Sequence, residues 1–134
     1  MQCLHTMRNK KKILVIEDEE VIQSLCRRLL ARMGYASVIV GGLKAAMQEI
    51  EKSNDIDMLI TDMRLPDGNS MDAIQKVCQK HPKTKILMIT GSVTIPEDRM
   101  TQLKDMGLTE KNVLFKPFEM KEFESIIDRC LGER

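Results

Sequence analysis

The chain has 134 residues, of which 43% are hydrophobic and 31% charged, a mixture typical of a soluble globular domain and not of a disordered chain. Its length fits one compact domain. The formal net charge is only +1, which argues against a dedicated nucleic-acid-binding domain. Basic residues gather at the start of the chain without acidic ones, so we expect a basic tail over residues 1–11, a folded domain over 12–131 and a short end at 132–134.

The cysteines and the apolar segments indicate where such a chain resides. Four cysteines are scattered singly, without the paired spacing of a zinc site, and are interpreted as reduced thiols. No apolar run approaches the length of about 18 residues that a transmembrane helix needs, and the first dozen residues lack the apolar centre of a secretory signal. We therefore expect a cytoplasmic protein without a membrane partner.

Strand and helix patterns alternate five times along the chain. Continuous apolar runs predict buried strands at 13–16, 38–40, 58–60, 86–89 and 113–115. Apolar residues at helical spacing follow each run, in stripes at 21–33, 43–50, 71–78, 100–103 and 120–131. The first stripe begins with Val21 and ends before Gly34. This alternation predicts an α/β domain whose parallel sheet carries helices on both faces.

Polar residues stand where four of the five predicted strands end. These residues are Glu17 and Asp18, Asp62, Thr90, and Lys116. In an open α/β sheet, ligands bind beyond the carboxyl ends of the strands, where the strand order reverses. If the order is 2-1-3-4-5, Asp18 and Asp62 face each other there. The second strand ends in Gly41-Gly42, from which we expect no functional contribution.

Each of these residues also has a simpler interpretation. Asp18 could cap a helix, Thr90 could belong to a turn, and Lys116 could be a solvated surface lysine. The segment 66–68 (Pro-Asp-Gly) is interpreted as turn chemistry alone. Their convergence favours a site, because crowded carboxylates repel one another and raise their pKa values. A divalent cation such as Mg²⁺ and a lysine ammonium would relieve that repulsion. A carboxylate beside Mg²⁺, with an ammonium and a hydroxyl nearby, is also what an aspartyl-phosphate intermediate requires.

Four motifs carry a resemblance to a known family. They are Ile-Glu-Asp at 16–18, Thr-Asp-Met-Arg-Leu-Pro-Asp-Gly at 61–68, Ile-Thr-Gly at 89–91 and Phe-Lys-Pro-Phe at 115–118. The span from about residue 11 to residue 131 resembles the receiver domain of two-component response regulators. This resemblance implies a flavodoxin-like (βα)5 fold, a three-layer sandwich with a five-stranded parallel sheet of order 2-1-3-4-5.

The resemblance also implies a role for each site residue. Asp62 would be the phosphoacceptor, and Asp18, Asp62 and the backbone carbonyl of Arg64 would hold Mg²⁺, with Glu17 acting mainly through a metal-bound water. Lys116 would pair with the phosphoryl oxygens and precede a cis bond to Pro117. Thr90 would hydrogen-bond the phosphoryl group.

The function implied is a phosphorylation-controlled signalling switch. The phosphoryl group would come from a sensor histidine kinase or a phosphotransfer protein, and the signal would pass to an effector or output domain. Such a domain assists its own phosphorylation and dephosphorylation but is not an enzyme in the ordinary sense. It would need no nucleic acid or membrane contact, and would be a monomer or a phosphorylation-dependent dimer.

Two alternatives remain open at this stage. One is a pseudo-receiver that binds partners without phosphorylation, although the key positions are chemically intact. The other is a haloacid-dehalogenase-like phosphohydrolase, which needs Asp-x-Asp after its first strand, where this chain has Glu17-Asp18-Glu19.

The chain also departs from the family pattern. Val113 stands where an aromatic residue is usual, and we expect the nearby Phe115 to pack under the last helix. A change on activation would then pass through the loop at 90–96. Arg64 and Ser92 occupy positions that tune phosphoryl lifetime in the family, and the segment between Thr90 and Lys116 is longer than usual.

Overall fold

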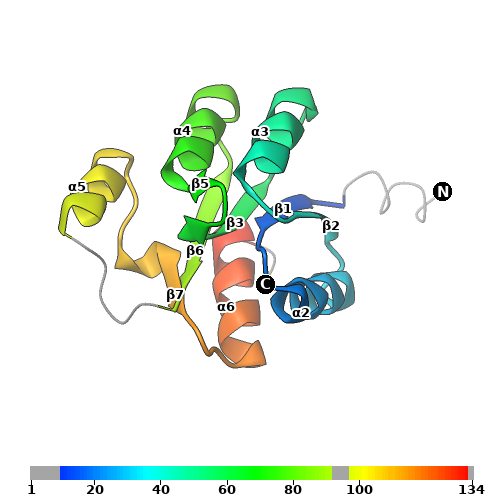
Figure 1. Ribbon diagram of the computed structural model, residues 1–134. Helices are drawn as coiled ribbons and strands as arrows, with labels where there is room; N and C mark the ends of the chain where they lie inside the picture. Colours follow the sequence, from blue (N-terminus) through cyan, green and yellow to red (C-terminus); the bar gives the residue numbers. More distant parts are fainter. Residues whose placement is uncertain (1–9, 92–96, 133–134) are drawn as a thin grey trace.

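A parallel sheet of five strands forms the centre of the computed structural model, which describes residues 10–91 and 97–132 (Figure 1). The strands are β1 (Lys12–Ile16), β2 (Ala36–Val40), β3 (Met58–Asp62), β6 (Lys85–Thr90) and β7 (Val113–Phe115). Their spatial order is β2-β1-β3-β6-β7. Since β4 (Arg64–Leu65) and β5 (Gly68–Asn69) pair only with each other in a short hairpin, the predicted order 2-1-3-4-5 is confirmed.

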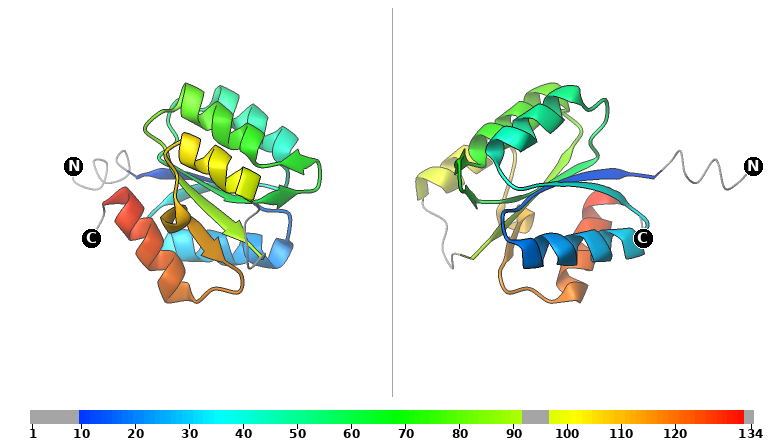
Figure 2. Two further views of the ribbon diagram at one scale, coloured as in Figure 1. Left: turned by 90° about the vertical axis from the view of Figure 1, so that its left-hand side faces the viewer. Right: turned by 45° about the vertical axis from the view of Figure 1, so that its right-hand side comes forward.

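Helices cover both faces of the sheet, as the alternating pattern predicted (Figure 2). The helices α2 (Glu20–Arg32) and α6 (Met120–Leu131) lie on one face. On the other face lie α3 (Leu43–Lys52), α4 (Met71–Lys80) and α5 (Glu97–Asp105). A short 3₁₀ helix, η1 (Glu110–Asn112), leads into β7. The fold is the flavodoxin-like three-layer sandwich that the resemblance implied.

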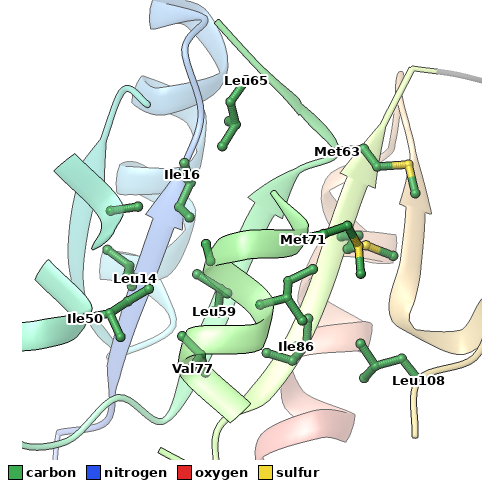
Figure 3. Close-up of a cluster of buried hydrophobic side chains, with 14 of the residues drawn as sticks. Leu14, Ile16, Ile50, Leu59, Met63, Leu65, Met71, Val77, Ile86 and Leu108 are labelled. Carbon is green, nitrogen blue, oxygen red and sulfur yellow. The ribbon is translucent and has the colours of Figure 1, made fainter. Parts of the chain in front are cut away.

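The continuous apolar strands supply a core on each side of the sheet. Side chains alternate between the two faces of a strand. Accordingly, Leu14 and Ile16 of β1 pack toward α3 and α4, in the cluster shown in Figure 3. Ile13 and Val15 pack on the opposite side, toward α2 and α6. A strand buried on both faces must be apolar at every position, which is why these runs show no alternation.

The end of α2 follows a sequence signal, but one residue of its apolar stripe does not. Gly34 closes α2 with a φ of 92°, a conformation that favours glycine, and Tyr35 donates its amide to the carbonyl of Leu30. Val21, predicted to belong to the apolar stripe of this helix, is instead 78% exposed. It lies about 100° around the helix from the half-buried Ile22, so the prediction for Val21 was wrong.

Several expectations fall partly on residues outside those described. Residues 1–9 of the predicted basic tail, Ser92, most of the 90–96 loop and residues 133–134 belong to this group. Among the described residues, Cys26, Cys78 and Cys130 are free thiols, and no helix there is long and apolar enough to cross a membrane.

A truncation in the core should measure how much the α6 face contributes to stability. Phe123 is fully buried and its ring stacks on Phe118 at 5.5 Å between centroids. We expect Phe123→Ala to lower the free energy of unfolding by about 3–5 kcal/mol, because it removes a buried ring and leaves a cavity. Met120→Ala, at an exposed position of the same helix, should cost less than about 1 kcal/mol. Urea unfolding followed by circular dichroism measures both, and equal losses would contradict the assigned core.

Candidate functional site

The strand register brings the predicted polar residues to one edge of the sheet. Glu17 and Asp18 follow β1 directly, and Asp62 is the last residue of β3. The ends of these strands are level, since Ile16 pairs with Thr61. On the other side of β3, Asp62 pairs with Ile89, the residue before Thr90.

Strand β7 completes this edge. Thr90, the last residue of β6, pairs with Phe115, and the amide of Lys116 donates to the Thr90 carbonyl at 2.8 Å. The bond between Lys116 and Pro117 is cis, as the resemblance implied. All five predicted side chains thus start from neighbouring strand ends.

The Lys116 ammonium is the centre of the site. Its Nζ donates to Oδ2 of Asp62 at 2.8 Å and lies 2.9 Å from Oε1 of Glu17. A longer contact of 3.4 Å reaches Oε1 of Glu19, which is more exposed. One cation therefore serves three carboxylates.

A second set of contacts orients the carboxylates. The amide of Arg64 donates to Oδ1 of Asp62 at 3.1 Å, and the amide of Glu19 donates to Oε2 of Glu17 at 3.0 Å. Each of these two carboxylates therefore has one oxygen toward Lys116 and the other on a backbone amide. Charge-assisted bonds of this kind hold a carboxylate in one orientation.

Burial dominates the electrostatics of Glu17, whose residue is only 2% exposed. Loss of solvent raises the pKa of Glu17, more than the Glu19 amide and Lys116 lower it, and the Asp62 charge adds the smallest contribution. Burial alone would lower the pKa of Lys116, but hydrogen bonds to Asp62 and Glu17 outweigh it and raise that pKa. The repulsion expected from the sequence is therefore secondary to desolvation at Glu17.

An oxygen cluster suited to a metal lies beside this lysine. Glu17, Asp18 and Asp62 each offer a carboxylate oxygen, and these three atoms lie within 4.8 Å of one another. Hard oxygen donors in this number suit Mg²⁺, which keeps several of its waters. Thr90 is buried beside them at the end of β6.

Two residues of this region were missed by the motif analysis. Glu19 was not predicted to belong to the site, yet its side chain reaches Lys116. Asp67 was assigned to a turn, but its carboxylate accepts the amides of Leu43 and Lys44 at 2.7 and 3.0 Å. The interpretation of segment 66–68 as turn chemistry alone was wrong, because this loop also binds the start of α3.

The expectation for Phe115 was also wrong. Its neighbour Leu114 packs in the core beneath α6, whereas Val113 packs in the core on the α5 side. Since side chains alternate along a strand, Phe115 shares the face of Val113, and it is 44% exposed. It therefore does not pack under the last helix.

Comparison with known proteins identifies the family. Residues 13–128 match the family model of the response regulator receiver domain. The chain belongs to this family. It is also similar to the response regulator protein PilR of Pseudomonas aeruginosa, with 29% identity over 126 residues. That match covers 94% of this chain but only 27% of PilR, so the chain spans about a quarter of this relative.

Solved receiver structures agree with this assignment. A CheY-like receiver domain protein of Methanospirillum hungatei superimposes with a TM-score of 0.83 at 22% identity, covering 93% of this chain and 96% of that one. A response regulator of Burkholderia pseudomallei, solved with a phosphorylated aspartic acid, calcium ion and citrate, gives a TM-score of 0.76 at 25% identity. That match covers 92% of this chain and 70% of the other.

Removing the central cation should destabilise the receiver in metal-free buffer. We expect Lys116→Met to lower the free energy of unfolding by about 1–3 kcal/mol at pH 7, because buried carboxylates lose their partner. The variant should also raise the pKa of Glu17 further. A raised pKa in the folded state means that the deficit shrinks as the pH falls toward the ordinary glutamate value of 4.5.

The control for this measurement is Lys52→Met. Its ammonium is exposed and lies 3.4 Å from Glu49, a carboxylate that also pairs with Lys12, so we expect a loss below about 1 kcal/mol. Urea unfolding at pH 7 and at pH 5 measures both variants. A deficit of Lys116→Met that grew on acidification would contradict the assigned charge balance.

Proposed function

We propose that this receiver is a phosphorylation-controlled switch that accepts a phosphoryl group on Asp62 from a sensor histidine kinase or phosphotransfer protein. The observation that carries the proposal is the position of the Asp62 carboxylate, 2.8 Å from the Lys116 ammonium and clustered with Glu17 and Asp18. The resemblance assigns the same residue. The phosphorylated aspartic acid of the Burkholderia pseudomallei regulator supports this chemistry at a receiver fold.

The transfer makes one bond and breaks one. A carboxylate oxygen of Asp62 attacks the phosphorus of a phosphohistidine, forming a P–O bond as the P–N bond breaks, and the leaving imidazole takes a proton. Lys116 moves from carboxylate to phosphoryl oxygens, which keeps its charge paired. The Thr90 hydroxyl, at the end of the next strand, would hydrogen-bond the transferred group.

The donor set fits a divalent cation. With Glu17, Asp18 and Asp62 ionised, three negative charges meet one lysine within the cluster, so a cation is needed before a further anion can enter. Asp18, Asp62 and the backbone carbonyl of Arg64 would hold Mg²⁺, with Glu17 acting through a bound water. When bound, Mg²⁺ neutralises charge that develops on the phosphoryl oxygens.

Two other functions are weaker on specific grounds. A pseudo-receiver would bind partners without modification, and intact Asp62 and Lys116 disfavour it. A haloacid-dehalogenase-like phosphohydrolase needs an acid two residues after its nucleophile, whereas residue 64 is an arginine. Its alternative placement after β1 fails as well, since residues 17–19 do not form Asp-x-Asp.

The partners and the location of this receiver are also proposals. The chain spans about a quarter of PilR, so neither its kinase nor its downstream effector or output domain follows from that similarity. We propose a cytoplasmic receiver that touches neither nucleic acid nor membrane itself and is a monomer or dimerises on phosphorylation. Residues 12–131 are proposed as its folded unit, flanked by the basic tail.

The phosphoacceptor assignment is tested directly by modification. With Mg²⁺ and a small phosphodonor such as phosphoramidate, we expect one acid-labile phosphoryl group per chain, and none on Asp62→Asn, because the nucleophilic oxygen is replaced by an amide. Asp55→Asn, an exposed residue before β3, is the control and should be labelled as wild type. Intact-mass spectrometry measures the adduct, and undiminished labelling of Asp62→Asn would refute the assignment.

The metal assignment is tested by thermal unfolding. Mg²⁺ should raise the melting temperature, because it binds the folded state and not the unfolded chain. Asp18→Ala should remove most of that increase, and Glu17→Ala should remove less, since Glu17 is proposed to act through water. If Mg²⁺ stabilised Asp18→Ala as much as wild type, the carboxylate cluster would not be the metal site.

A further inference from the structure

The carboxylate of Asp67 joins two loops that border the site. Asp67 lies in the turn between β4 and β5, in the hairpin that follows β3, the strand that ends in Asp62. Its two oxygens accept different amides at the start of α3, Oδ1 from Leu43 at 2.7 Å and Oδ2 from Lys44 at 3.0 Å. The hairpin that follows Asp62 is therefore fixed to the helix that follows β2.

Two glycines allow this close approach. A Cβ on Gly42 would lie 2.8 Å from Oδ1 of Asp67, and a Cβ on Gly68 would lie 2.7 Å from Cδ2 of Leu43. The φ of Gly68 is 153°, which side chains rarely adopt. The end of β2, expected to contribute nothing, thus contributes a backbone bare of side chains where Asp67 docks.

The Asp67 contact joins two segments that each also contact the site. On the hairpin side, Arg64 donates its amide to Asp62 at 3.1 Å, and Asp62 accepts from Lys116. On the helix side, β2 ends at Val40, whose carbonyl accepts the Glu17 amide at 3.0 Å. Glu17 in turn pairs with Lys116, so the two loops meet again at the site.

We propose that Asp67 is a positioning residue for the phosphoacceptor site, acting as a clamp that holds the β4–β5 hairpin so that the Arg64 backbone stays beside Asp62. The clamp itself is a property of the metal-free fold. Its effect on Mg²⁺ and on phosphoryl transfer rests on the proposed function. A residue that only capped α3 would stabilise that helix without altering the Arg64 amide or the metal site.

A second contact of the same helix, α3, provides the matched control. Glu51, near the far end of α3, pairs with Lys76 at 2.7 Å and Lys80 at 3.2 Å on α4. It is exposed and joins α3 to the element after the hairpin, as Asp67 joins α3 to the hairpin. Glu51→Gln therefore weakens a comparable tie away from the site.

The experiment compares Asp67→Asn, Asp67→Ala and Gly42→Ala with Glu51→Gln in the full chain. Gly42 has extended backbone angles that alanine tolerates, so Gly42→Ala displaces the Asp67 carboxylate without altering it. In metal-free protein, hydrogen exchange at the amides of Leu43, Lys44 and Arg64 should accelerate in the three clamp variants and stay unchanged in Glu51→Gln. Asp67→Asn keeps one acceptor and should show the smaller effect.

Metal binding and phosphoryl transfer supply the second readout. Titration of Mg²⁺ by NMR should give a Kd about tenfold weaker for Asp67→Ala and Gly42→Ala than for wild type, the size expected when a supporting contact of a metal site is lost. The rate of labelling by phosphoramidate should fall in parallel. The Asp67→Ala/Gly42→Ala double variant should be no weaker than either single variant, because both remove one contact.

The outcomes separate this proposal from the proposed function. Unchanged Arg64 exchange in Asp67→Ala, or equal losses in Glu51→Gln, would overturn the clamp. If wild type neither bound Mg²⁺ nor accepted a phosphoryl group, the proposed function would fail, while the exchange of Arg64 would still decide the clamp. If Gly42→Ala did not fold, the two Asp67 variants would give the same test.

Discussion

One ammonium group holds together the charged end of this receiver. Lys116 lies within 3.4 Å of oxygens from Glu17, Glu19 and Asp62, and Asp18 adds another carboxylate to the same cluster. Side chains of like charge crowd in this way only where a cation offsets them. The single lysine offsets only part of the charge, so the site favours the entry of a further cation. In the proposed function, phosphoryl oxygens would take the place of a carboxylate as the partner of Lys116.

The parallel sheet is what makes this arrangement possible, and the sequence predicted it well. Apolar runs without alternation indicate strands covered on both faces, and every parallel strand then ends at the same edge. The polar residues that follow those runs could be predicted to lie close together, because the hydrophobic pattern shows where each strand ends. The order of the strands follows less directly, since periodicity does not show which strands are neighbours. The strand order was predicted from the resemblance of the motifs to the receiver family.

Contacts between loops were beyond the reach of the same reasoning. Asp67 accepts the backbone amides of Leu43 and Lys44. Since every residue except proline has such an amide, the residue types do not show where this contact forms. The sequence around Asp67, Pro-Asp-Gly, is also typical of an ordinary turn. Phe115 was misplaced for a different reason. Alternation shows that Phe115 shares a face with Val113, but the apolar pattern does not show which face of the sheet the last helix covers. The 44% exposure of Phe115 also depends on what covers its face, which the pattern does not show either.

The edge formed by β6 and β7 connects the site to the surface over a short path. Thr90 and Phe115 are register partners, so their side chains share a face, and one is buried while the other is 44% exposed. The Thr90 carbonyl also accepts the amide of Lys116, so the lysine and the threonine that would meet the phosphoryl group are joined by backbone as well. Val113, buried two residues earlier, lacks a ring that could swing between inner and outer positions. The paired backbones of β6 and β7 therefore link Lys116 and Thr90 directly to the exposed Phe115, and this link involves no aromatic residue at position 113.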